Sequence, residues 1–82
     1  MIFTVYVLIN PDSILYIGHT DNINRRLFEH NNGLTGYTSS RNGPWELVYS
    51  EDGYASRGEA MRREKFFKTG KGREFIKSKL EK

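Results

Sequence analysis

The segment IFTVYVLINPDSILYIGHT, residues 2–20, predicts a β-hairpin. Residues 2–9 and 14–20 are rich in β-branched and aromatic side chains, which are typical of strands. Pro11-Asp12-Ser13 between them is a turn signal, because these residue types favour the backbone angles of tight turns. The start of the chain is therefore expected to form two paired strands.

Two tyrosines are expected on one face of this hairpin. Successive strand residues alternate between faces, so a three-residue loop brings Tyr6 and Tyr16 to the same side. A slip of one residue in the pairing would separate them. The opposite face would then carry the core side chains Val5, Val7, Leu15 and Ile17.

The next segment predicts an amphipathic helix. Asp21 is a good N-cap residue, and Gly33 is expected to end the helix. Ile23, Leu27 and His30 fall at helical spacing and are expected to form the buried stripe.

Two neighbouring arginines on this helix are not equivalent. Arg26 flanks the buried stripe, three residues after Ile23 and four before His30. Arg25 points to the other side and can pair with Glu29 at i+4.

The second half predicts one strand and two more helices. Residues 33–44 are rich in Gly, Ser, Thr and Asn and are expected to be a polar loop, followed by a strand over residues 45–51. A capping box in the sequence SRGE opens a helix over residues 56–69 that stops at Gly70. A short helix over residues 73–80 follows. We expect one domain over residues 1–82, because no repeat or linker interrupts the chain.

Charge is distributed unevenly along the chain. Residues 1–56 hold three basic and six acidic side chains, a net of −3, whereas residues 57–82 hold ten basic and four acidic ones, a net of +6. A basic half fits a polyanionic partner, because cations near phosphates release condensed counterions. A solvated helix surface explains the same charge and is the more common case.

The composition limits the class of protein. The chain has no cysteine, which rules out disulfides and thiolate zinc sites and fits a reducing compartment. No apolar stretch approaches the roughly 20 residues that span a bilayer. The first residues lead directly into a strand, so no signal peptide is expected. We expect a cytoplasmic protein with no membrane partner.

Glu64 is the most informative single residue of the second half. It shares a helix face with Ala60 and Phe67, and a carboxylate beside apolar positions is costly to bury alone. A salt bridge is one explanation. The other is a hard cation, since Mg²⁺ is often held by one or two carboxylates with water and phosphate oxygens. Spacing alone leaves both open.

The remaining candidates also have structural alternatives. Arg26 suits a phosphoryl oxygen but is more often a surface or helix-packing residue. His30 is more often a packed histidine than a catalyst. Tyr6 and Tyr16 are common strand aromatics, and a phenol with a pKa of about 10 is a poor base at neutral pH unless a cation assists it.

These residues together resemble the GIY-YIG nuclease superfamily, in its small stand-alone bacterial branch. Thr4-Val5-Tyr6 matches the first motif and Tyr16-Ile17-Gly18 the second. Arg26 and His30 follow on the first helix, and Glu64 lies on the second. The resemblance covers essentially the whole chain.

The resemblance implies an α/β (α+β) fold, with a three-stranded antiparallel sheet flanked by helices in the order ββαβαα. It also implies hydrolysis of DNA phosphodiesters with Mg²⁺ or Mn²⁺. Tyr6 would accept a proton or orient the attacking water, with Tyr16 and His30 in support. Arg26 would stabilise the transition state, and Glu64 would hold the metal.

Two departures from the family pattern stand out. Thr4 and Val5 replace Gly-Ile while Tyr6 is retained, and no match is found for a polar C-terminal residue, often Asn, that many relatives carry. A monomer or weak dimer that uses a targeting protein is expected, in DNA repair or in processing of branched or flap DNA. Expected phosphate contacts are Arg25, Arg41, Lys68, Lys71 and Arg73.

Two other functional classes remain as alternatives. A non-catalytic nucleic-acid-binding module would bind DNA in a salt-sensitive way without cutting it. A protein-interaction adaptor would not bind DNA even at low salt.

Overall fold

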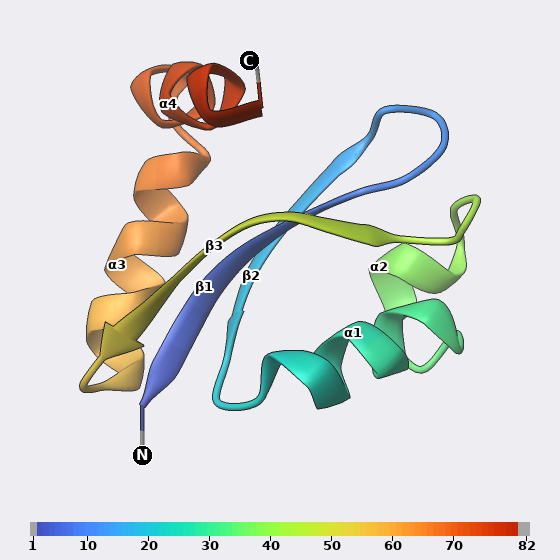
Figure 1. Cartoon of the computed structure of the whole chain (residues 1–82), viewed down its shortest axis with the longest axis horizontal. Helices are drawn as coiled ribbons and strands as arrows, with labels where there is room; N and C mark the ends of the chain where they lie inside the picture. The colour runs from blue at the N-terminus through green and yellow to red at the C-terminus, as the bar shows by residue number, and fades with distance from the viewer. Residues whose placement is uncertain (1, 81–82) are drawn as a thin grey trace.

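A computed structural model describes residues 2–80 and confirms the expected fold class (Figure 1). Three strands form one antiparallel sheet in the order β2-β1-β3. The elements are β1 (Phe3–Ile9), β2 (Leu15–Thr20), α1 (Ile23–Asn31), α2 (Gly36–Ser39), β3 (Glu46–Tyr54), α3 (Arg57–Phe67) and α4 (Gly70–Leu80).

The strand register confirms the predicted faces of the hairpin. Tyr6 lies opposite Gly18 and Leu8 lies opposite Tyr16, so the two tyrosines share a face. Their ring centroids are 6.1 Å apart. Because β2 pairs only with β1, it forms one edge of the sheet, beside the tyrosines.

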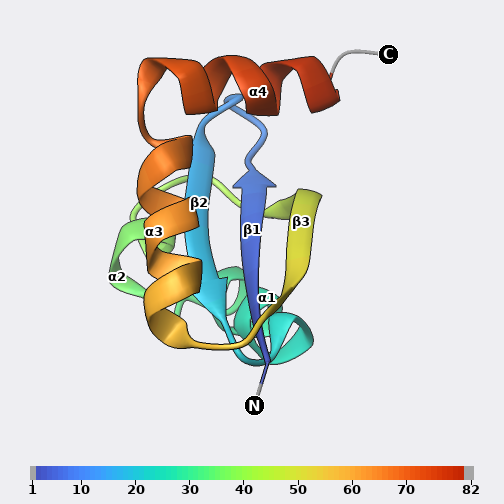
Figure 2. The ribbon, with the colours of Figure 1, turned by 90° about the vertical axis from the view of Figure 1, so that its left-hand side faces the viewer.

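Helices cover both faces of the sheet, as Figure 2 shows with α3 nearer the viewer beside β2, and α1 and α2 behind the strands. The α3 face carries the main apolar cluster, as predicted from strand alternation. Its buried members are Phe3, Val5, Val7, Ile17, Ala60, Phe67 and Ile76. The α1 face carries a second cluster, with Tyr6, Leu8 and Trp45 buried and Ile14, Tyr16, Ile23 and Leu27 packed against them.

The predicted polar loop over residues 33–44 is partly wrong, because it contains the one-turn helix α2. Thr38 of this helix is buried, and its hydroxyl lies 2.9 Å from His30 Nδ1. A single turn has too few residues for a helical period, and its position depends on this long-range contact.

Several element boundaries also differ from the prediction, and α3 ends at Phe67 instead of residue 69. Asn22 rather than Asp21 caps α1, since its side chain accepts from the Arg25 amide at 3.0 Å. Strand β3 continues three residues further, to Tyr54. Helix α4 begins at Gly70 instead of residue 73, because Thr69 Oγ1 accepts from the Gly72 amide at 3.1 Å and so caps the helix.

Gly72 explains how α4 turns sharply away from α3. An added Cβ at this position would lie 1.9 Å from the Phe66 carbonyl oxygen, so only glycine allows the two helices to approach. No helix within residues 2–80 has the length and apolar character needed to cross a bilayer.

Candidate active site

Tyr6 and His30 form the buried floor of the candidate site. Tyr6 is 1% exposed and His30 is 2% exposed. The Tyr6 hydroxyl oxygen lies 2.9 Å from His30 Nε2. The prediction that His30 belongs to the buried stripe of α1 is therefore confirmed, and the imidazole also holds the hydroxyl of a candidate catalytic residue.

Arg26 lies between this floor and solvent. It is half-buried, and its Nη1 donates to Glu29 Oε1 at 2.9 Å. This hydrogen bond is the largest of the effects that raise the pKa of Arg26. The nearby Tyr6 and Tyr16 side chains raise the pKa further. The guanidinium is therefore a permanent charge beside both phenols.

Burial makes the Tyr6 hydroxyl a weaker acid than an ordinary tyrosine. Burial raises the pKa of its hydroxyl above the ordinary value, although the Arg26 guanidinium acts in the opposite direction. Tyr6 is therefore a neutral phenol at pH 7, able to orient a partner more readily than to deprotonate it.

Gly18 makes room for the two tyrosine rings. An added Cβ would lie 2.7 Å from the Tyr6 hydroxyl oxygen and 3.0 Å from Cε1 of Tyr16. The missing side chain of Gly18 therefore lets these two rings pack against the strand.

Replacing Gly18 by alanine should therefore displace the Tyr6 ring from His30. We expect a loss of about 1–3 kcal/mol of unfolding free energy, as is usual for overpacking. Urea denaturation followed by Trp45 fluorescence measures it. The matched control is Gly36→Ala, where an added Cβ meets nothing within 4 Å. Equal stability of the two variants would contradict this account of Gly18.

His30 is anchored on its other side by two threonines. Its Nδ1 lies 2.9 Å from Thr38 Oγ1 and 3.0 Å from Thr35 Oγ1, and the two hydroxyls also hydrogen-bond to each other. Burial, with a smaller contribution from Arg26, lowers the pKa of His30 to about 4. The imidazole is therefore neutral at pH 7.

This shift predicts an acid-sensitive stability. Because the unfolded chain takes up a proton at about 6.5 and folded His30 only at about 4, the stabilising contribution of neutral His30 is complete above pH 6.5. It is lost as the pH falls towards 4, and amounts to on the order of 1–3 kcal/mol. Urea titrations across this window should show a steeper pH slope for wild type than for His30→Gln. Parallel slopes would contradict the assignment.

Glu64 lies on the other side of β2 from the tyrosines. It reaches from α3 to His19 of β2, whose Nδ1 is 2.7 Å from its Oε1, and its Oε2 accepts from Lys68 Nζ at 2.9 Å. The predicted apolar stripe is confirmed, because Ala60 and Phe67 of the same face are both fully buried. The salt-bridge alternative for Glu64 is thus realised in this structure.

His19 is held in one tautomer by its neighbours. Arg57 Nη1 lies 3.2 Å from His19 Nε2, and a guanidinium only donates, so Nε2 accepts and Nδ1 carries the proton towards Glu64. Burial raises the pKa of Glu64, but the hydrogen bonds from His19 and Lys68 outweigh it and the net shift is downward. Glu64 is therefore ionised at neutral pH.

Two open pockets border β2, one on each side of this cluster. The first, of about 270 Å³, is lined by Leu15, Tyr16, Ile17, Tyr37, Lys68 and Arg73. The second, of about 320 Å³, is lined by His19, Thr20, Asp21, Arg25, Arg26 and Arg57. Basic side chains therefore stand at both ends of the edge strand.

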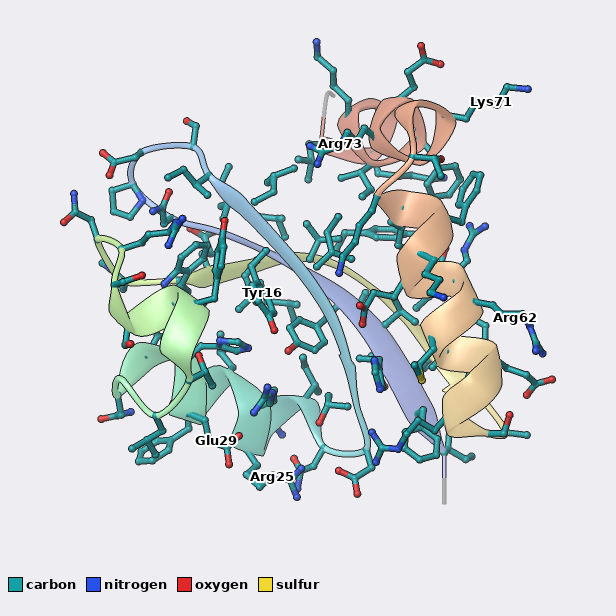
Figure 3. All side chains as sticks on the ribbon, turned by 180° about the vertical axis from the view of Figure 1, so that it is seen from behind. Tyr16, Arg25, Glu29, Arg62, Lys71 and Arg73 are labelled. Atoms are coloured by element: carbon teal, nitrogen blue, oxygen red, sulfur yellow. The ribbon has the colours of Figure 1, made fainter. Side chains whose placement is uncertain are left out.

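The five predicted phosphate contacts do not form a single cluster. Arg25 lines the second pocket, and Lys68 and Arg73 line the first. Arg41 stacks on the Tyr37 ring, with its guanidinium carbon 4.0 Å from the ring centroid. Lys71 lies apart from them, since it points away from β2 while Arg73 lies on the side towards Tyr16 (Figure 3).

The helix-pair prediction for Arg25 is correct in part. Its Nε is 3.8 Å from Glu29 Oε2, but its closer partner is Asp21, with Nη2 donating to Oδ1 at 2.8 Å. Glu29 is closer to Arg26.

A divalent metal fits Glu64 only with help from the substrate. Residues 2–80 contain no group of three His, Cys, Asp or Glu side chains that could hold a metal ion. Glu64 is ionised, and its side chain is 18% exposed, so solvent and a phosphate can reach it. This donor set suits a hard cation that keeps several waters and shares phosphate oxygens.

Four residues of the site are absent from the sequence-based prediction. They are His19, Tyr37, Thr38 and Arg57. His19 has a local signal, since it directly follows Tyr16-Ile17-Gly18 on the strand. The others are brought in by contacts between distant segments, which local pattern does not reveal.

Comparison with known proteins identifies the family of this chain. The family described as "GIY-YIG catalytic domain" matches residues 2–78. A UPF0213 protein of Staphylococcus epidermidis is 42% identical over 66 residues, which cover 79% of this chain and 78% of that protein. A UPF0213 protein of Streptococcus agalactiae is 46% identical over 65 residues, covering 78% of this chain and 72% of the relative.

A solved structure shows the same fold. The solution NMR structure of a UPF0213 protein from Bacillus halodurans aligns with a TM-score of 0.56 at 31% identity, over 95% of this chain and 84% of that one. The chain therefore belongs to the GIY-YIG nuclease family, and its relatives are small bacterial UPF0213 proteins.

Proposed function

We propose that this chain is a divalent-metal-dependent endonuclease that hydrolyses phosphodiester bonds of DNA. One observation carries the proposal. The Tyr6, Tyr16 and His30 rings form one cluster on the α1 side of the sheet, Arg26 of α1 is close enough to lower the pKa of Tyr6 against its burial, and ionised Glu64 contacts β2 from the other face.

Arg26 is the group that suits the phosphate. It is half-buried, so its charge is screened less than that of a surface arginine. Glu29 engages Nη1 and fixes the guanidinium plane. The other N–H donors can bind a non-bridging phosphate oxygen, where negative charge grows during hydrolysis.

The two tyrosines suit the attacking water. In hydrolysis a water oxygen bonds to phosphorus, the bond to the bridging oxygen breaks, and a proton of the attacking water passes through solvent water to the leaving oxygen. The Tyr6 hydroxyl, which is held by His30, would orient this water, with Tyr16 in support. Because burial raises the pKa of Tyr6, we assign it the orienting role rather than the proton-accepting one.

Glu64 would hold the metal ion. A bound Mg²⁺ or Mn²⁺ would polarise the phosphoryl group and stabilise the leaving oxygen. His19 fixes the carboxylate by its bond to Oε1, and Lys68 occupies Oε2. Lys68 is half-exposed and on a flexible stem, so it can move from the carboxylate to a phosphate.

The same proposal includes a role in DNA repair or in the processing of branched or flap DNA. It also includes a protein partner that directs the enzyme to its target. The competing function is a binding module without catalysis, favoured by one observation: both oxygens of Glu64 already have side-chain partners.

The test is cleavage by purified protein of single-stranded, duplex, flap and branched DNA and of RNA, with Mg²⁺, Mn²⁺ or EDTA. Cutting of DNA that requires the metal supports the nuclease. Salt-sensitive binding without cutting supports the binding module, and no binding at low salt supports a protein adaptor.

A further inference from the structure

Of the residues that line the pocket beside Tyr16, only Tyr16 and Lys68 have a role in the chemistry described above. Tyr16 and Tyr37 contribute rings 5.5 Å apart, and Leu15 and Ile17 contribute the rest of the wall at the edge of the sheet. A phosphate gains little from rings and aliphatic side chains. A flat heterocycle gains from both.

Tyr37 is the exposed ring of this pocket. It is 44% exposed, on the one-turn helix α2. Arg41 stacks on it and donates to the Tyr37 carbonyl oxygen at 3.4 Å, which holds the ring in place. Thr38, the next residue, ties the same helix to His30 of the catalytic cluster.

Two cations border the pocket. Lys68 and Arg73 line it from α3 and α4, and Figure 3 shows Arg73 on the side of α4 that faces Tyr16. Their charges suit the phosphates on either side of a bound base. The backbone of edge strand β2, which pairs only with β1, adds N–H and C=O groups for the edge of a base.

We propose that this pocket binds one unpaired nucleobase, stacked on Tyr37, next to the phosphate held by Arg26. This rests on the proposed nuclease function and narrows its substrate to a single-stranded segment. Bases of a duplex are paired and stacked, and an enzyme reaches them only after they leave the helix. The second pocket continues along β2 and would take the neighbouring phosphates through Arg25 and Arg57.

The experiment measures binding in EDTA, so that no strand is cut. A labelled mixed-sequence single strand and its blunt duplex are titrated by fluorescence anisotropy with wild type, Tyr37→Ala and Tyr37→Leu. Phe28→Ala is the matched control, because Phe28 is a 61% exposed aromatic that lines none of the pockets described. A series of strands carrying one abasic site at each position is titrated with the same proteins.

Both Tyr37 variants should bind the single strand about tenfold more weakly than wild type, with duplex binding unchanged. In wild type, one abasic position should cause a similar loss, and that loss should vanish in the Tyr37 variants. Phe28→Ala should behave as wild type. The proposal would be overturned if wild type bound every abasic strand equally well. It would also be overturned if the Tyr37 variants bound single strand and duplex with equally reduced affinity. If circular dichroism shows that both Tyr37 variants are unfolded, the abasic series measured with wild type alone decides whether the pocket binds a base.

The outcome is separable from that of the cleavage test. A protein that shows the coupling between Tyr37 and one base but never cuts DNA would refute the nuclease and keep the base pocket. A protein that cuts DNA but shows no coupling would refute the pocket alone.

Discussion

Glu64→Gln is expected to reduce metal-dependent DNA cleavage by about 10³-fold or more. The amide keeps the size of the side chain and its bond to His19 but removes the charge that a hard cation requires. A metal supplies several kcal/mol of transition-state stabilisation, and each 1.36 kcal/mol is tenfold in rate.

The fold should survive this substitution. The ion pair to Lys68 is half-exposed, and such pairs contribute about 0–1 kcal/mol. Titration calorimetry with Mn²⁺, on protein saturated with a phosphorothioate DNA that resists cleavage, gives a readout independent of turnover, and metal binding should weaken in Glu64→Gln. Glu59→Gln is the matched control, since Glu59 is an exposed residue in the first turn of the same helix. Retained cleavage in Glu64→Gln would exclude Glu64 as the metal ligand.

Arg26→Lys is expected to lower kcat by about 10²-fold, with a smaller change in KM. Lysine keeps the charge but loses the planar fork that binds both Glu29 and a phosphate oxygen. The loss should therefore appear mainly in the transition state.

The matched control is the neighbouring Arg25→Lys. Arg25 points to Asp21 and lines the second pocket, where a charge without special geometry is sufficient. Its cleavage rate should stay within a few fold of wild type in the same single-turnover assay. If Arg26→Lys also stayed within a few fold of wild type, Arg26 would act only through its charge, which would contradict this account.

Much of the fold was predictable because its local signals agree with one another. The hairpin follows from strand propensity and the residues of its turn, and the shared face of Tyr6 and Tyr16 follows from strand alternation. Exact boundaries were less predictable. Asp21 and Asn22 are adjacent and equally suited to cap α1. Glycine typically follows the end of a helix, but Gly70 is the first residue of α4 because Thr69 caps that helix.

The site was predictable where its residues sit in fixed local spacing. Arg26 and His30 are placed by one helix, and Glu64 by the apolar stripe of another. Lys68 lies at i+4 from Glu64, but the other partner of Glu64 was not predictable, because His19 is 45 residues away in sequence. Tyr37 was hidden for the same reason, since α2 owes its position to contacts with His30 and not to a periodic pattern.

The most direct test of the proposed nuclease is single-turnover cleavage of one labelled DNA substrate by wild type, Arg26→Ala and Glu64→Gln, each at a concentration that saturates the DNA. The account predicts that wild type cuts with Mg²⁺ or Mn²⁺ and not in EDTA, while both variants remain bound and cut at least about 10²-fold more slowly. Binding by wild type without cutting, together with unchanged binding by Glu64→Gln, would contradict it.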